Sequence, residues 1–389
     1  MMPMEIAPGI YDVGATDWIV RDFHGYKTER GASYNSYLIV DEKICLIDTV
    51  KACYAEELLE KISRVADPAK IDYVVVNHVE LDHAGALPEV LKAAPNAKFV
   101  ITMQGKNEAL RHYGDGFDFM VVKEGDKISL GSRELTFVPM PMLHWPDNMV
   151  TYCPQDGILF SNDAFGQHYA SSKRFDDEVD EYVLFYEAKK YFANILWPYA
   201  RLIGGALKKA SALDIKMIAP AHGVIWRSKI AQILEKYAGW GTGVNGKSVV
   251  IAYDTMWGGT EALARAMVEG AAAAGVKVQL MRMDRTPCST VAAELFEAGG
   301  LLVGSPTLNS GMMPTIGGML VYLKGLQPKG KKAAAFGTCG WAGGAQKDME
   351  AMLTAGGFDL QPGFNCKWRA CVDETEAARQ FAYEFAKNL

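Results

Sequence analysis

The sequence predicts an α/β protein made of two successive domains with different patterns. Up to about residue 237, short apolar runs expected to be strands are separated by loops and a few helices. After the glycine-rich segment GWGTGVNGKS (residues 239–248), strands and helices alternate regularly. The length of 389 residues also fits more than one domain. We therefore expect one domain over residues 1–245 and a second over residues 246–389.

The first domain is expected to contain hairpins, single strands and a long helical region. Two hairpins and two further strands are predicted at residues 36–50, 151–163, 97–103 and 134–142. The apolar spacing of residues 180–210 is that of a helix, which we expect to be interrupted at Pro198.

The second domain is expected to be a doubly wound parallel sheet. Apolar runs predict strands at residues 248–253, 277–283, 299–304 and 331–337. Amphipathic segments predict helices at residues 260–275, 315–326 and 345–357. Helices between short apolar strands are typical of parallel sheets that are covered on both faces.

The composition excludes several classes of protein. Hydrophobic residues make up 49% of the chain and charged residues 22%, which favours a packed core over disorder. A formal charge of -6 without a long Lys/Arg run argues against nucleic-acid binding. No apolar run approaches the ~18 residues of a membrane span, and the N-terminus lacks a secretory signal. The seven cysteines are scattered without a CxxC pair, so we expect reduced thiols, a cytoplasmic location and no rubredoxin-like iron site.

Four potential metal ligands are crowded into the stretch NHVELDHAG (residues 77–85), directly after the apolar run YVVV. They are His78, Glu80, Asp82 and His83. The alternative is a polar turn in which Asp82 caps a helix. Four such groups side by side would repel one another or titrate unless something bound them. The stretch therefore favours a metal site at the end of a strand.

Three more candidate ligands follow apolar runs later in the first domain. His144 comes after VPMPML, Asp163 after GILFSN and His222 after IKMIAPA. A single histidine at a strand end is usually a surface or structural residue. Four histidines and three carboxylates in this arrangement indicate metal ligands instead.

This ordered set resembles the metallo-β-lactamase-like domain of flavodiiron proteins. The resemblance implies an αββα sandwich with two non-haem irons. By the resemblance, one iron is held by His78, Glu80 and His144, and the other by Asp82, His83 and His222, with Asp163 as the bridge. The family leaves open whether the histidine at position 83 binds iron directly.

The chemistry of the ligands agrees with iron. Two histidines and one carboxylate suit Fe(II) with open positions, and the absence of a thiolate disfavours a structural zinc site. The hydrolytic relatives carry a histidine where this chain has Glu80. The added negative charge favours more highly oxidised iron, as a redox site needs. Zinc bound by the same ligands remains the alternative.

Three further residues lie near the site by their position in the family: His24, His168 and Tyr191. We expect them to orient ligands or supply protons. Structural packing is the alternative for each of them.

The second domain carries three loops that predict a flavin site. The loop YDTMWGGTE (residues 253–261) lacks the Gly-Lys-Ser/Thr of a nucleotide-triphosphate loop, but its backbone N–H groups and threonines can hold a phosphate. Two more loops, at residues 304–314 and 337–345, follow strands at the edge where open α/β sheets bind ligands. This arrangement resembles flavodoxin and implies FMN. The expected FMN contacts are Thr255, Met256, Trp257, Gly258, Gly259, Thr260, Ser305, Pro306, Thr307, Leu308, Asn309, Thr338, Gly340, Trp341, Ala342 and Gly343.

Together the two resemblances cover nearly the whole chain and imply an oxidoreductase. Flavodiiron proteins reduce dioxygen to water, nitric oxide to nitrous oxide, or both, and the sequence does not separate these substrates. We expect a separate electron donor, a rubredoxin or a reduced deazaflavin, and a head-to-tail homodimer or a dimer of dimers. Two other hypotheses on function remain open: a metal-dependent hydrolase fused to a flavodoxin, and a flavodoxin-type electron carrier.

Overall fold

The computed structural model describes residues 2–243 and 245–389, which group into two compact units by their internal contacts. Within the described residues, the first unit comprises residues 2–21, Thr28–Tyr191 and Arg201–Gly241, and the second comprises Asp22–Lys27, Phe192–Ala200 and residues 242–243 and 245–389. The change from one unit to the other at Gly241–Thr242 lies close to the expected domain boundary. No pattern in the sequence indicated that two short segments of the first half group with the second unit.

The first unit contains two β-sheets. The larger sheet has the strand order β1 (Met4–Ala7), β2 (Ile10–Asp12), β5 (Tyr37–Val40), β6 (Ile44–Ile47), β7 (Ile71–Val75), β8 (Lys98–Ile101) and β9 (Phe119–Val121). The smaller sheet has the order β10 (Lys127–Ser129), β11 (Glu134–Pro139), β12 (Met149–Cys153), β13 (Ile158–Asn162) and β14 (Met217–Pro220). A separate short pair is formed by β3 (Ala15–Asp17) and β4 (Ala32–Tyr34).

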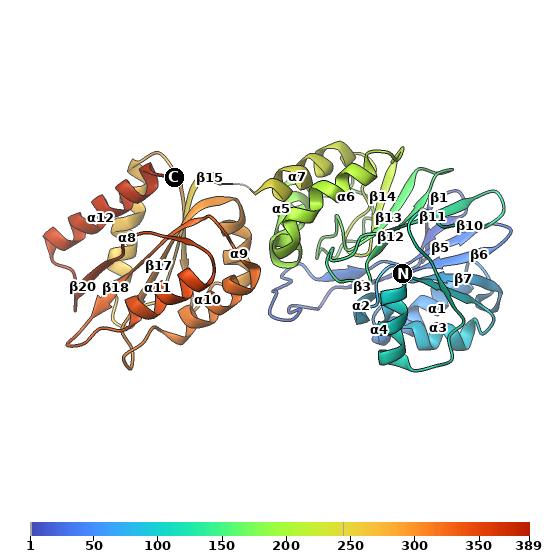
Figure 1. Ribbon diagram of the computed structural model, residues 1–389, viewed down its shortest axis with the longest axis horizontal. Helices are drawn as coiled ribbons and strands as arrows, with labels where there is room; N and C mark the ends of the chain where they lie inside the picture. The colour runs from blue at the N-terminus through green and yellow to red at the C-terminus, as the bar shows by residue number, and fades with distance from the viewer. Residues whose placement is uncertain (1, 244) are drawn as a thin grey trace. The chain divides into compact units, whose positions relative to one another are not determined.

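Side chains alternate between two apolar cores along the larger sheet, because successive residues of a strand point to opposite faces. Leu38 and Val74 pack in a core with residues of the first helices, whereas Ile39 and Val75 pack against residues of the smaller sheet. Figure 1 shows the helices of this unit outside the two sheets. They are α1 (Ala55–Ser63), α2 (Leu81–Ala84), α3 (Leu87–Ala93), α4 (Met103–Tyr113), α5 (Glu181–Tyr191), α6 (Ile203–Ala210) and α7 (Ile230–Thr242). The expected αββα sandwich is therefore confirmed.

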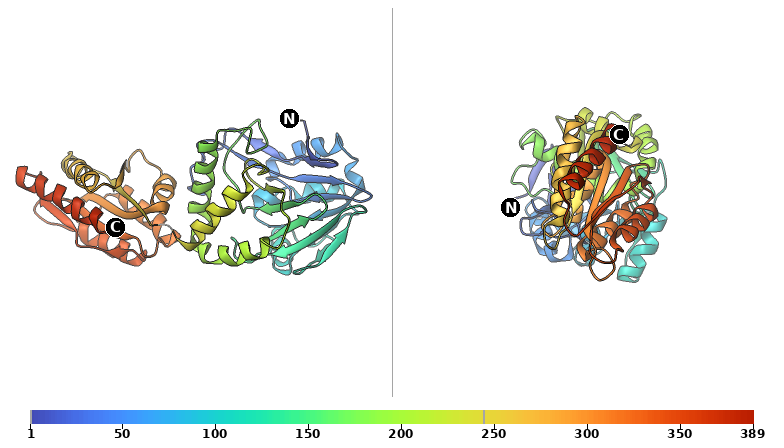
Figure 2. Two further views of the ribbon diagram at one scale, coloured as in Figure 1. Left: turned by 90° about the horizontal axis from the view of Figure 1, so that it is seen from above. Right: turned by 90° about the vertical axis from the view of Figure 1, so that its left-hand side faces the viewer.

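The second unit contains a parallel sheet with helices on both faces, seen as yellow to red ribbons in Figures 1 and 2. Its strand order is β16 (Lys277–Arg282), β15 (Gly246–Tyr253), β17 (Ala298–Pro306) and β18 (Lys332–Cys339), after which β18 pairs with both β19 (Asp359–Leu360) and β20 (Phe364–Lys367). This is the flavodoxin-like order 2-1-3-4-5. Core residues of α9 (Cys288–Glu297), α10 (Pro314–Leu326) and α11 (Ala345–Ala355) cover one face, and those of α8 (Gly259–Ala273) and α12 (Val372–Lys387) cover the other. The expected doubly wound parallel sheet is confirmed.

Most expected elements form where the sequence predicted them, with one difference at the glycine-rich segment. Both hairpins are antiparallel pairs, β5 with β6 and β12 with β13, and the long helical region changes to a π-helical turn at Phe192–Leu196 and a 3-10 turn at Trp197–Leu202. Residues 239–248 are not a loop throughout, because α7 continues to Thr242 and β15 begins at Gly246. Trp240 is buried and its ring lies 5.4 Å from that of Tyr237, which holds the last turn of the helix in place. Val244 of this segment lies outside the described residues.

No helix in the described part of the chain is both long enough and apolar enough to cross a membrane.

Candidate metal centre and flavin site

The seven expected metal ligands come together where strands of both sheets end. His78 and Glu80 follow β7, and Asp82 and His83 lie on the short turn α2. The other three, His144, Asp163 and His222, follow β11, β13 and β14. Because β13 and β14 are parallel, their carboxyl ends meet at one edge and bring Asp163 and His222 together.

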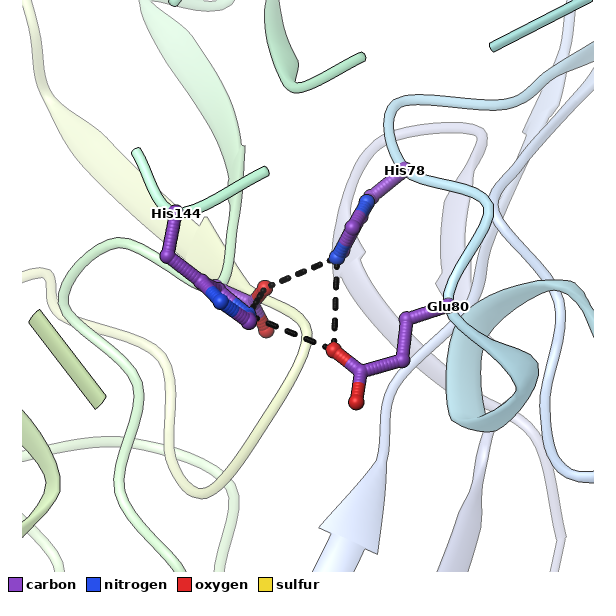
Figure 3. Close-up of side chains that lie close together, drawn as sticks. His78, Glu80 and His144 are labelled. Atoms are coloured by element: carbon purple, nitrogen blue, oxygen red, sulfur yellow. Dashed lines mark ion pairs between the residues drawn. The ribbon is translucent and has the colours of Figure 1, made fainter. Parts of the chain in front are cut away.

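The ligand atoms form two groups that meet at Asp163. One group is His78, Glu80, His144 and Asp163, and the other is Asp82, His83 and His222. Figure 3 shows His78, Glu80 and His144 pointing toward one another. The two carboxylate oxygens of Asp163 face different groups: Oδ2 lies 3.3 Å from His144 Nε2, and Oδ1 lies 3.0 Å from His83 Nε2 and 3.4 Å from His222 Nε2. One carboxylate is thus placed between two clusters.

Several of the ligand atoms lack a hydrogen-bond partner, as expected of atoms that bind metal ions. Within the described residues, the Nε2 atoms of His78 and His83, Oδ1 of Asp82 and Oδ2 of Asp163 are buried without a hydrogen-bond partner. Buried polar atoms are normally hydrogen-bonded, so atoms that face one another without such bonds need another partner. Imidazole nitrogens and carboxylate oxygens are suitable ligands for iron. All seven residues therefore fit a site with two irons.

Neighbouring groups fix the orientation of two ligand histidines. Asp147 accepts from His78 Nδ1 at 2.9 Å and from the backbone N–H of Val79 at 2.7 Å, which leaves Nε2 of His78 for a metal. The backbone carbonyl of Ser33 lies 2.7 Å from His222 Nδ1 and directs that ring in the same way. Sequence reasoning missed Asp147, because a single acidic residue in a loop gives no signal of its partner.

A buried network supports the chain on both sides of the ligands. Asp48 accepts from the backbone N–H of Asn77 at 2.7 Å and from the side chains of Asn77 and Asn162 at 2.9 and 3.2 Å. Asn162 has a positive φ of 52°, which asparagine tolerates better than most residues, and this turn precedes Asp163. Asp48 thus connects the two strand ends that carry His78 and Asp163.

Two of the three residues expected beside the metals lie against the ligands. The hydroxyl of Tyr191 donates to Asp163 Oδ1 at 2.9 Å, and the ring of His168 lies 5.1 Å from those of both Tyr191 and His222. Burial raises the pKa of Tyr191 well above its usual range, and the charge of Asp163 adds to this effect. Burial, followed by the neighbouring His222, lowers the pKa of His168 well below its usual range. Tyr191 therefore remains a phenol, and His168 a neutral imidazole.

His24 is not brought into this cluster. Its side chain is exposed, its ring contacts Phe23 at 4.6 Å, and its segment Asp22–Lys27 groups with the second unit.

The flavin-type loops of the second unit surround a pocket of about 400 Å³. The pocket lies at the carboxyl ends of parallel strands, where open α/β sheets bind ligands. All but four of the expected FMN contacts line it: Thr255, Met256, Trp257, Gly259, Pro306, Thr307, Leu308, Asn309, Thr338, Gly340, Trp341 and Ala342. Sequence reasoning missed Ser310, Cys339 and Trp368, which also line it.

The four other expected residues do not line the pocket, and three of them shape its loops. The hydroxyl of Ser305 accepts from the backbone N–H of Met313 at 2.9 Å, and that of Thr260 is 3.2 Å from the hydroxyl of Thr338. Gly258 has a φ of +82° just before α8, a conformation that favours glycine. Gly343 is exposed, with no contact to the pocket among the described residues.

The loop before α8 allows a ligand to approach its backbone N–H groups closely. The hydroxyl of Thr255 accepts from the backbone N–H of Gly258 at 3.1 Å, which orders the turn at the start of the helix. A Cβ at Gly259 would lie 2.9 Å from the carbonyl oxygen of Trp368, so a side chain there would push the loops apart. Backbone N–H groups at a helix N-terminus favour an anion such as a phosphate. This loop therefore fits the phosphate of FMN.

Comparisons with known proteins agree with both sites. Residues 32–223 match the family described as ODP family beta lactamase, and residues 251–381 match the family described as flavodoxin. A nitric oxide reductase from Moorella thermoacetica is 46% identical over all of this chain and 99% of its own length.

Two solved structures share the complete fold at 39% identity and a TM-score of 0.97. They are a flavodiiron protein from Giardia intestinalis and a rubredoxin oxygen:oxidoreductase from Desulfovibrio gigas. Each comparison covers 100% of this chain, and 96% and 98% of the respective structures. FMN and a non-haem diiron centre are the cofactors that these relationships support, and the chain belongs to the flavodiiron family of oxidoreductases.

Proposed function

We propose that this protein reduces dioxygen to water, nitric oxide to nitrous oxide, or both, with electrons that reach the irons through FMN. The observation that carries the proposal is the pair of buried ligand groups that share Asp163, on the same chain as a flavodoxin-type pocket. The names of the relatives include both a nitric oxide reductase and an oxygen oxidoreductase, so both gases are candidates.

In this proposal, His78, Glu80 and His144 would hold one iron, Asp82, His83 and His222 would hold the other, and Asp163 would be shared by both. When bound, the irons supply open coordination positions for a diatomic gas and take up electrons from reduced FMN. The 3.0 Å separation of His83 Nε2 from Asp163 Oδ1 supports direct binding by His83. Glu80 gives the first group a carboxylate where a hydrolase of this fold has an imidazole.

The residues beside the ligands would orient them and supply protons. Asp147 and the Ser33 carbonyl hold two imidazole rings in place. Tyr191 holds a proton on its hydroxyl at the bridging carboxylate, and His168 contacts Tyr191 within the same buried cluster. Reduction of either gas to these products consumes protons, and these two residues would take part in supplying them.

The flavin pocket would hold FMN with its phosphate at the loop before α8 and its ring at the two other loops. Thr255 and the backbone around Gly259 meet the phosphate, and the loops that contain Thr307 and Gly340 meet the isoalloxazine. The corresponding domains are residues 1–245 and 246–389.

Partners and assembly follow from the same proposal. The electron donor is a separate molecule, a rubredoxin or a reduced deazaflavin, and the protein works in the cytoplasm. A head-to-tail dimer, or a dimer of such dimers, brings FMN of one chain to the irons of its partner. A monomer with full activity at working concentration would contradict this assembly.

The test is stopped-flow absorbance of the fully reduced protein, mixed separately with dioxygen and with nitric oxide. We expect fast flavin reoxidation by at least one gas, with about two irons per chain, and loss of both in Glu80→Ala. Slow reoxidation that is the same with both gases, or zinc in place of iron, would favour an electron carrier or a hydrolase instead.

A further inference from the structure

Trp368 comes from a strand end that sequence reasoning did not connect with the flavin. It follows β20, which pairs in parallel with β18, so its loop lies at the same sheet edge as the three flavin-type loops. Its backbone N–H donates to the carbonyl of Cys339 at 2.7 Å, and its φ is +56°. The structure therefore fixes the backbone of Trp368 against the loop after β18.

Two glycines of the flavin-type loops pack directly on Trp368. A Cβ at Gly340 would lie 3.0 Å from the indole ring, and a Cβ at Gly259 would lie 2.9 Å from the Trp368 carbonyl oxygen. Both distances are too short for an undisturbed side chain. One tryptophan thus sets the spacing between the loop before α8 and the loop after β18.

The indole ring of Trp368 is one side of an aromatic rim. It lines the pocket, and its centroid is 5.8 Å from that of Trp341, with an angle of 46° between the rings. Trp368 is 65% exposed and Trp341 is 88% exposed. Large aromatic side chains at one pocket mouth are typical of sites that bind a flat apolar ligand.

We propose that Trp368 forms an aromatic wall of the flavin pocket beside Trp341 and packs against the isoalloxazine ring of FMN. The inference rests on the proposed binding of FMN and adds a fourth loop, the one after β20, to the site. The contact is with the ring, because the indole lies next to Gly340 of the ring loop while only its backbone carbonyl reaches Gly259.

Riboflavin, which has the ring but no phosphate, separates ring contacts from phosphate contacts. Full-length protein freed of FMN is titrated with riboflavin and with FMN, and binding is followed by quenching of flavin fluorescence. In Trp368→Ala we expect both dissociation constants to rise by about the same factor, roughly tenfold, since stacking on one aromatic side chain has about this effect. Trp368→Phe keeps an aromatic face and restores most of the affinity.

The control is Trp18→Ala, which removes an exposed tryptophan of the first unit that does not line the pocket, and which leaves both constants unchanged. Unchanged binding of both flavins in folded Trp368→Ala and Trp368→Phe overturns the inference. So does a loss confined to FMN, because that result places the effect at the phosphate loop. Failure of the wild-type protein to bind FMN would contradict the proposed function instead.

Discussion

The metal centre and the flavin pocket differ in how deeply their residues are buried and in whether those residues are charged. At the metal centre, His78, His83, Asp163 and His222 are at most 1% exposed, and charged groups face one another in the interior. At the flavin pocket, Trp257 and Trp341 are 96% and 88% exposed at the edge of a packed sheet. A buried charge needs a partner, whereas an exposed ring does not. Substitutions at the metal centre should therefore change folding stability as well as binding, and those at the flavin pocket should chiefly change binding.

The largest expected effect is that of Asp163→Ala. Without metal, this carboxylate is the common partner of four imidazoles, and removal of one partner from a buried charged group costs about 3–5 kcal/mol of unfolding free energy. Iron should fall to less than one per chain, while FMN binding stays as in the wild type. Metal analysis and urea unfolding measure both effects. The control Asp115→Ala removes an exposed carboxylate of the same unit. An equal loss of unfolding free energy in both variants would contradict the claim that the burial of Asp163 at the metal centre causes the loss.

Asp147→Asn should give the next largest effect, on iron affinity. The asparagine side chain keeps the size of aspartate but removes the negative charge that holds His78 Nδ1. Loss of such an orienting partner typically weakens metal binding about 10–100-fold. Competition with a chelator measures the affinity. Wild-type affinity in this variant would show that His78 is oriented by packing alone.

Gly259→Ala tests the flavin pocket. The added Cβ would meet the Trp368 carbonyl oxygen and push the two loops apart, so we expect FMN to bind about tenfold more weakly, with iron content unchanged and a much smaller loss of unfolding free energy than in Asp163→Ala. Gly318→Ala is the matched control, because it lies within α10 with nothing within 4 Å of the added Cβ, and it should be neutral or slightly stabilising. A large loss of stability in Gly259→Ala would show that this loop belongs to the folding core.

A further expected effect is a pH dependence of the metal-free protein. Burial lowers the pKa of both His144 and His222, but their hydrogen bonds to Asp163 and to Glu80 or Asp82, together with the charges of these carboxylates, outweigh burial and raise the pKa values to about 9 and about 10. Since an unfolded histidine has a pKa of about 6.5, the folded protein holds extra protons above that pH. The stability from these pairs is fully present below about pH 6.5 and is lost as the pH rises through about 9 to 10.

Urea unfolding of the chelator-treated protein at about pH 6.5, 8 and 9.5 measures this decline. In the iron-loaded protein, both imidazoles are neutral ligands, and this contribution should disappear. Identical pH profiles with and without iron would contradict the account of the metal centre.

The sequence predicted the metal ligands well because each lies close to a strand end that its apolar run reveals. His78, Glu80, Asp82 and His83 are also close together in the chain, so their proximity did not depend on the fold. Asp147 and Asp48 were missed because a single acidic residue in a loop carries no sign of its partner. Their contacts to His78 and Asn77 join segments that are far apart in the sequence.

In the second unit, the sequence patterns predicted the strands β15 to β18 and the helices α8, α10 and α11, but not the helices α9 and α12 or the short strands β19 and β20. The four residues of β20, Phe364–Lys367, are too few for a clear alternation, and Trp368 after them was therefore not assigned to the pocket. His24 was expected near the metals from the family alone, and no pattern in its segment indicated that it groups with the second unit. Local patterns thus reveal elements and nearby ligands, whereas long-range contacts need the structure.

The most direct test of the metal centre is Mössbauer spectroscopy of the protein loaded with isotopically enriched iron, together with the iron content. If Asp163 binds both irons, the oxidised protein should contain about two irons per chain as one magnetically coupled pair. Two uncoupled irons, or one iron per chain, would contradict the claim that a single carboxylate joins the two ligand groups.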